Sequence, residues 1–67
     1  MKHVTPQKME SALNIRAWSL VRINGSHHIW KSADGTRTGV VPFHRRDLAA
    51  GTQRSIMRVA ELTDDDL

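Results

Sequence analysis

Two turn signals, each lying between runs rich in apolar residues, constrain the fold of this chain more than any other feature. Asn24-Gly25 and Asp34-Gly35 are dipeptides typical of the two-residue turns that join antiparallel strands. β-Branched and aromatic residues flank both turns. They predict strands over residues 18–23, 26–32 and 36–43. We therefore expect a three-stranded antiparallel sheet in the middle of the chain.

Helical patterns flank this sheet on both sides. Thr5-Pro6 provides an N-cap and a first helical position, and apolar residues follow at helical spacing, so a helix is predicted over residues 5–15. Gly51-Thr52 opens a second predicted helix, with Thr52 as its cap. The order αβββα predicts one α+β domain over residues 1–67, in which both helices cover one face of the sheet.

The composition limits the cellular compartment and the kinds of site that we expect. The 67 residues suffice for one small domain. The chain has no cysteine, so we expect neither a disulfide framework nor a thiolate zinc site, and this fits a reducing cytosol. No apolar stretch is long enough for a membrane span, which predicts a cytoplasmic protein without membrane contact.

Charge is distributed unevenly along the chain. Residues 1–60 contain ten Lys and Arg against three acidic residues, a formal charge of +7, whereas residues 61–67 carry −4. A basic body with an acidic end favours a polyanionic partner, with nucleic acid the first candidate. The alternative is that the protein is basic for solubility alone.

The two turns also predict the strand register, provided that neither hairpin contains a bulge. Arg22 then pairs with His27, and Trp30 pairs with Gly39. The face assigned to the core beneath the helices holds Val21, Ile23, His28, Trp30, Val41 and Phe43. The face turned away from the helices, called the open face, holds Trp18, Leu20, Arg22, His27, Ile29, Lys31 and Val40. A slip of one residue would invert this assignment.

The adjacent residues His27 and His28 are expected on opposite faces of the sheet. His28 then points toward the helices and is interpreted as a hydrogen-bonded core histidine. His27 lies on the open face, with Arg22 across from it and His44 diagonal to it. Two histidines and an arginine can cleave RNA without a metal, because they can move protons at the 2′-OH and the leaving oxygen and stabilise the phosphate charge. The alternative is that His27 is only an exposed polar residue beside a turn.

Other residues suggest binding surfaces. Those predicted to bind RNA are Arg22, Lys31, Arg45, Arg46, Arg54 and Arg58. A solvated basic surface is the alternative interpretation of this set. Trp18, Leu20 and Ile29 on the open face suit a protein partner better than stacked bases. A zinc site built from the histidines is disfavoured, because adjacent strand residues diverge and neither a carboxylate nor a cysteine lies at ligand spacing.

Four segments together form a specific sequence pattern, although each segment alone is only weak evidence of a family. They are Gly-Ser-His-His-Ile-Trp at 25–30, Asp-Gly at 34–35, Val-Pro-Phe-His at 41–44, and the stretch from Leu48 through Gly-Thr-x-x-Ser-Ile at 51–56. Together they resemble the HicA toxin family of bacterial toxin–antitoxin systems, from about Met9 to Leu62. The chain departs from the family at Ala17, where glycine is usual, and at Gly39, where a bulkier residue is usual and where a bulge in the third strand is therefore suggested.

The resemblance implies a fold like that of double-stranded-RNA-binding domains, and ribosome-independent cleavage of mRNA without a cofactor. It implies that the histidine directly after Gly-Ser, His27 in this chain, is essential, and that basic residues such as Arg22, Lys31, Arg54 and Arg58 bind RNA. The implied partners are mRNA and a neutralising HicB-like antitoxin, which we expect to cover the open face, with no DNA binding by this chain alone. The alternatives are a non-catalytic RNA-binding module and a protein-interaction domain with an acidic partner.

Overall fold

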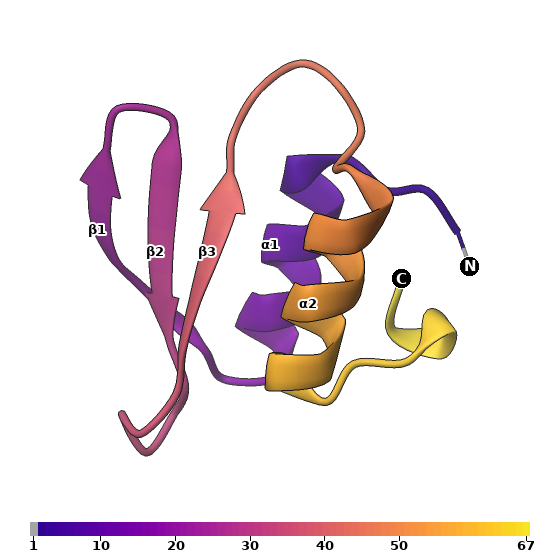
Figure 1. The fold of residues 1–67 in the computed structure, drawn as a ribbon. Helices are drawn as coiled ribbons and strands as arrows, with labels where there is room; N and C mark the ends of the chain where they lie inside the picture. Colours follow the sequence, from indigo (N-terminus) through magenta and orange to yellow (C-terminus); the bar gives the residue numbers. More distant parts are fainter. Residues whose placement is uncertain (1) are drawn as a thin grey trace.

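The chain folds into two layers, with both helices against one face of a three-stranded sheet (Figure 1). The computed structural model describes residues 2–67. Its elements are α1 (Pro6–Ile15), β1 (Ser19–Asn24), β2 (His27–Lys31), β3 (Thr38–Pro42), α2 (Ala50–Ala60) and a final 3-10 turn, η1 (Asp64–Asp66). The sheet is antiparallel, in the order β1-β2-β3. The predicted α+β class and αβββα order are confirmed.

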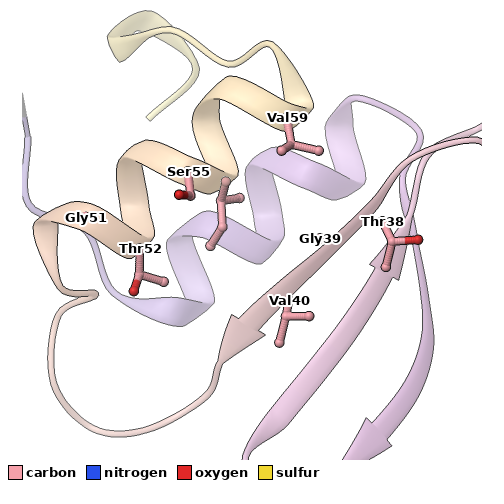
Figure 2. A pocket seen from close by; sticks show the side chains of 8 residues that line it. Thr38, Gly39, Val40, Gly51, Thr52, Ser55 and Val59 are labelled. Carbon is pink, nitrogen blue, oxygen red and sulfur yellow. The ribbon is translucent and has the colours of Figure 1, made fainter.

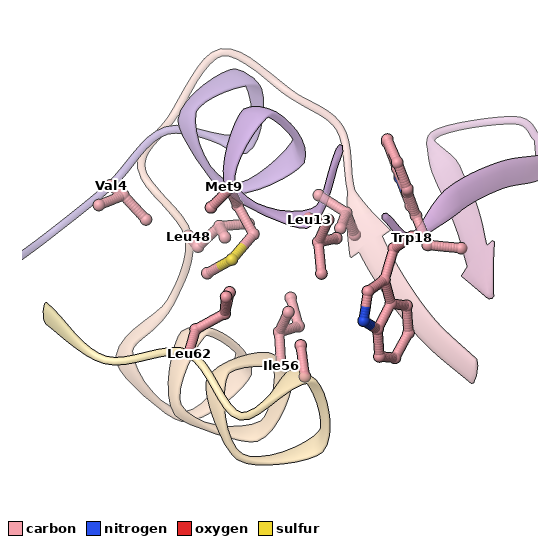
Figure 3. Close-up of a cluster of buried hydrophobic side chains, with 11 residues drawn as sticks. Val4, Met9, Leu13, Trp18, Leu48, Ile56 and Leu62 are labelled. Atoms are coloured by element: carbon pink, nitrogen blue, oxygen red, sulfur yellow. The ribbon is translucent and has the colours of Figure 1, made fainter. Parts of the chain in front are cut away.

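The hydrophobic core lies between the helices and the sheet (Figure 3). Met9 and Leu13 of α1 and Val41 of β3 are fully buried, and the two tryptophans, Trp18 and Trp30, are 4% and 6% exposed. The other buried apolar residues are Val4, Ala12, Leu48, Ile56, Ala60 and Leu62. Because both helices contact β3, this strand carries most of the helix–sheet packing and holds the sheet against them.

The two helices begin in different ways. Thr5 caps α1 as predicted, since its hydroxyl accepts a hydrogen bond from the Lys8 N–H at 3.2 Å and Pro6 follows it. The predicted cap of α2 is wrong. Ala49 is the N-cap residue there and makes no side-chain capping bond, and Thr52 lies inside the first turn of the helix.

α1 ends in a left-handed turn that directs the chain into the core. Ala17 has φ +64°. Its N–H donates to the Asn14 carbonyl, and the N–H of Trp18 donates to the Leu13 carbonyl, both at 3.0 Å. This pair of bonds is the Schellman motif, in which glycine usually occupies the left-handed position. The motif brings Trp18 back against the helix that it follows.

The β1–β2 hairpin differs from the predicted register in two ways. Its turn residues are Gly25, with φ +61°, and Ser26, so Asn24 rather than Arg22 lies opposite His27. A bulge between Leu20 and Arg22 then shifts the pairing by one residue. The prediction assumed that no bulge was present, and the structure places the bulge in β1.

The bulge reverses the faces of the residues that precede it. Leu20 pairs with Trp30 and therefore lies on the helix side of the sheet, and Trp18 is buried there. Their predicted placement on the open face is wrong for this reason. Val21 and Ile23, predicted in the core, are 52% and 58% exposed, because β1 is the edge strand farther from the helices (Figure 1).

The pairing of β2 with β3 follows the predicted register. Trp30 lies opposite Gly39 and His27 opposite Pro42, without the bulge suggested at Gly39. The Phe43 N–H donates to the Ser26 carbonyl at 2.6 Å, so His27 and Pro42 form a non-hydrogen-bonded pair. The ladder at this point therefore does not need the N–H that proline lacks.

Asp34 organises the loop between β2 and β3. Its carboxylate accepts hydrogen bonds from the Thr36 N–H at 3.0 Å, the Thr36 hydroxyl at 2.7 Å and the Ser32 hydroxyl at 2.8 Å. These bonds, led by those from Thr36, lower the pKa of Asp34 to about 2. The loop thus depends on an ionised carboxylate to fix the register of β2 against β3.

Replacing Ala17 with glycine should stabilise the protein, because glycine adopts the left-handed conformation without the steric cost that alanine carries. Glycine also gives the unfolded chain more conformational entropy, which reduces this stabilisation. We expect a net gain of about 1 kcal/mol in the free energy of unfolding. Urea unfolding measures the change. Ser11→Gly on the exposed side of α1 is the control and should lose about 0.5 kcal/mol. A destabilised Ala17→Gly variant would contradict the left-handed turn.

Replacing Asp34 with asparagine should lower the Tm at pH 7, because the hydrogen-bonded carboxylate stabilises the folded state there. Since the folded-state pKa is lowered, this stabilisation is present above the unfolded pKa near 4 and is lost as the pH falls toward 2. The Tm difference between wild type and Asp34→Asn should therefore shrink from pH 5 to pH 2 in circular-dichroism melts. Asp47→Asn is the matched control. A Tm difference that does not change with pH would contradict this role of the Asp34 carboxylate.

Candidate nucleic-acid interface and active site

Adjacent histidines of β2 occupy opposite faces of the sheet, as predicted. His27 is the first residue of the strand, and its side chain is exposed on the open face. His28 is half-buried on the helix side, where its ring stacks on Phe43 with the centroids 4.4 Å apart and the planes 7° from parallel. One histidine is thus a packed part of the structure, whereas the other is accessible to a ligand.

Glu10 of α1 holds the buried histidine. One carboxylate oxygen, Oε2, lies 2.7 Å from His28 Nδ1 and accepts a hydrogen bond from Trp30 Nε1 at 2.8 Å. Against an ionised carboxylate the imidazole Nδ1 donates, because a carboxylate only accepts. The sequence analysis missed this contact. Its only signal was that Glu10 is the sole acidic residue before Asp34.

Several polar side chains surround His27 at one end of the sheet. Asn24 lies directly opposite His27 on β1, and Arg22, two pairs farther along the ladder, lies on the same face opposite Ile29. The β1–β2 turn and the loop from β3 to α2 lie at the same end of the sheet (Figure 1), and the Phe43 N–H donates to the Ser26 carbonyl of the turn, so His44 follows directly after this contact. His44 Nδ1 accepts a hydrogen bond from the Arg46 N–H at 3.2 Å, so a proton on this ring resides on Nε2.

All six basic residues predicted to bind RNA are exposed. Arg45 and Arg46 follow β3 at the His27 end, whereas Lys31 lies at the other end of β2 and Arg54 and Arg58 lie on α2. In residues 2–67 the salt bridges involve Arg16, His28 and Arg37 only. The six predicted residues therefore keep their positive charge unpaired within the described chain.

The acidic end of the chain is partly neutralised by basic residues outside this set. The Asp66 carboxylate accepts two hydrogen bonds from Arg16 Nη2, at 2.9 Å and 3.0 Å, and Glu61 pairs with Arg37 at 3.2 Å. Hydrogen bonds from the Thr63 N–H and from Arg16 lower the pKa of Asp66. Part of the acidic charge is thus held away from the open face.

The predicted apolar patch of the open face needs correction. Trp18 is buried and Leu20 lies on the helix side, so neither belongs to that face. Ile29 does belong to it, and its partner on β3 is Val40, which is 44% exposed. The apolar centre of the open face is therefore the Ile29–Val40 pair, with Arg22 opposite Ile29 on β1.

A groove of about 570 Å³ lies between β3 and α2, and Val40 lines it at the β3 edge (Figure 2). Its lining is mainly apolar and small, and the hydroxyl-bearing residues among it are Thr38, Thr52 and Ser55. His27, His44 and Arg22 do not line it. The candidate catalytic residue therefore stands on an exposed face rather than in a pocket, an arrangement that suits a long polymeric ligand.

Within residues 2–67, no three metal-binding side chains of His, Asp and Glu come together, and no helix is long and apolar enough to cross a membrane. Three histidines are exposed, and of these His27 and His44 lie in or directly after the sheet, whereas His3 precedes α1.

Comparison with known proteins identifies the family. A search of curated proteins finds no match to the chain. A family model described as the HicA toxin of bacterial toxin–antitoxin systems matches residues 7–62, which include α1 from its second residue, the whole sheet and α2. The match covers most of the chain, and we conclude that this protein belongs to the HicA toxin family.

Proposed function

We propose that this protein is the toxin of a type II toxin–antitoxin system and acts as an endoribonuclease that cleaves mRNA independently of the ribosome. Membership of the HicA family supports a toxin that cuts mRNA. The observation that carries the assignment of the site is the exposure of His27 beside a His28 that is already hydrogen-bonded and stacked. Only His27 of this pair is accessible to take up a proton from a substrate.

The proposed chemistry uses the ribose next to the scissile phosphate. One group removes the proton of the 2′-OH, and the 2′-oxygen then attacks phosphorus. The bond to the 5′-oxygen breaks, and a second group protonates that oxygen, which leaves a cyclic phosphate on one fragment and a 5′-hydroxyl on the other. His27 takes one of these two roles, and His44 can assist in the other, with its Nε2–H facing away from the Arg46 bond.

Cationic side chains supply the electrostatic part of this mechanism. The guanidinium of Arg22 lies on the same face as His27 and can stabilise charge that develops on the phosphate. Arg45 and Arg46 are exposed at the same end and can hold the neighbouring phosphates. Lys31 extends the RNA contact along the open face to the far end of β2. Arg54 and Arg58 lie on α2, on the other side of the sheet, and would contact only RNA that continues past the open face.

His27→Ala should abolish RNA cleavage while the fold survives, because the side chain is exposed and has no structural partner among the described residues. Loss of one general acid or base predicts a decrease of about a hundredfold or more in the cleavage rate. Labelled RNA incubated with purified protein, and growth arrest on expression, measure the loss.

His3→Ala, an exposed histidine before α1, is the matched control, and it also tests for a contaminating nuclease. A fully toxic His27→Ala protein would overturn the proposal. RNA that is bound but left intact by the wild type would instead favour the non-catalytic RNA-binding module.

The proposed protein partner is a HicB-like antitoxin that covers the open face and buries His27. This face offers the apolar pair Ile29 and Val40 beside an unpaired Arg22, a combination that suits a partner with apolar and acidic side chains. An antitoxin bound there would exclude RNA from His27 directly.

Val40→Asp should weaken antitoxin binding about tenfold or more, because it puts a charge at the centre of the proposed interface. Ile15→Asp is the control, since Ile15 is 81% exposed at the end of α1 on the helix side and the substitution adds the same charge. Calorimetry with the antitoxin encoded beside the toxin gene measures both affinities. Loss of binding only in the Ile15 variant would refute an open-face interface.

A further inference from the structure

We propose that Glu10 is a positioning residue for His27: by bonding His28 and Trp30 together, it fixes the strand segment from which His27 projects. Glu10 lies on the helix side of the sheet, so it cannot touch RNA bound on the open face. The inference rests on the proposed function, because it assumes that His27 is the catalytic group.

The carboxylate of Glu10 joins α1 to two places on β2. Its Oε2 binds Nδ1 of His28 at 2.7 Å and Nε1 of Trp30 at 2.8 Å. These residues are two apart, so both side chains leave the strand on the same face. A single oxygen therefore sets the distance between α1 and the segment that begins directly after His27.

The carboxylate is costly to bury unless it has partners. The side chains of Glu10 and His28 are only 17% and 14% exposed. The two hydrogen bonds, one of them to an imidazole that can carry charge, offset the loss of water around the carboxylate. Such a contact is directional, and it therefore restricts the rotation of His28 and with it the strand backbone.

Phe43 also restrains the strand on either side of His27. Its ring stacks on His28, and its N–H donates to the carbonyl of Ser26 at 2.6 Å. The residue before His27 is thus held through its backbone, and the residue after it is held through its side chain. With the rigid Pro42 opposite, His27 has little backbone freedom, so the direction in which its side chain leaves the strand is fixed.

The test compares Glu10→Ala with wild type and with Glu10→Gln, whose amide oxygen can still accept hydrogen bonds from His28 and Trp30. We expect kcat for RNA cleavage to fall about tenfold in Glu10→Ala with KM nearly unchanged, and to recover in Glu10→Gln, because misplacement of a catalytic group lowers the rate of the chemical step. The NMR signals of the His27 imidazole should shift in Glu10→Ala. All assays are run well below the Tm of each variant.

Asp66→Ala is the matched control, since it removes the other carboxylate that ties down α1, through Arg16 at its C-terminal end. It should lower the Tm without changing kcat or the His27 signals. If Glu10→Ala does not fold, His28→Phe is used in its place. This variant keeps an aromatic ring against Phe43 but cannot form a hydrogen bond with Glu10, and we expect the same loss in kcat.

The outcomes separate this inference from the proposed function. Full kcat and unchanged His27 signals in a folded Glu10→Ala protein would overturn the positioning role, even if His27→Ala is inactive. Normal cleavage by His27→Ala would instead remove the proposed function. In that case the His27 imidazole signals still decide whether Glu10 orients this side chain.

Discussion

The alternation of side chains along β2 is the constraint on which the rest of the structure depends. β2 is the central strand, so pairing on both of its edges fixes which residues face the helices. This alternation sends His28 and Trp30 to Glu10 and leaves His27 on the opposite face. A slip of one residue would bury the candidate catalytic group and expose an indole in its place.

The sequence predicts the second hairpin better than the first, for a physical reason. The β2–β3 register follows from a loop in which the Asp34 carboxylate and Gly35, at φ +77°, act locally. In the first hairpin the turn falls one residue later than the dipeptide suggested, and the bulge between Leu20 and Arg22 changes the faces again. No residue type marks that bulge, which places Trp18 and Leu20 on the helix side of the sheet.

Contacts between distant segments escaped the sequence analysis for a different reason. Glu10 meets His28 18 residues later, and Gln53 is fully buried where it bonds the Val4 N–H, 49 residues away. A polar residue inside a helix is ordinarily interpreted as solvent-facing. Only the folded arrangement shows that these two residues satisfy hydrogen bonds in the interior. The left-handed backbone of Ala17 at the end of α1 explains why glycine is usual at this position, and not why this chain has alanine there.

The proposed function depends on the division of the sheet into a packed face and an exposed basic face. NMR observation of the histidine imidazoles during titration with an RNA blocked by 2′-O-methylation tests this division most directly. The account predicts that the His27 signals shift on binding while those of His28 stay in place. RNA that moves the His28 signals and leaves those of His27 unchanged would contradict it.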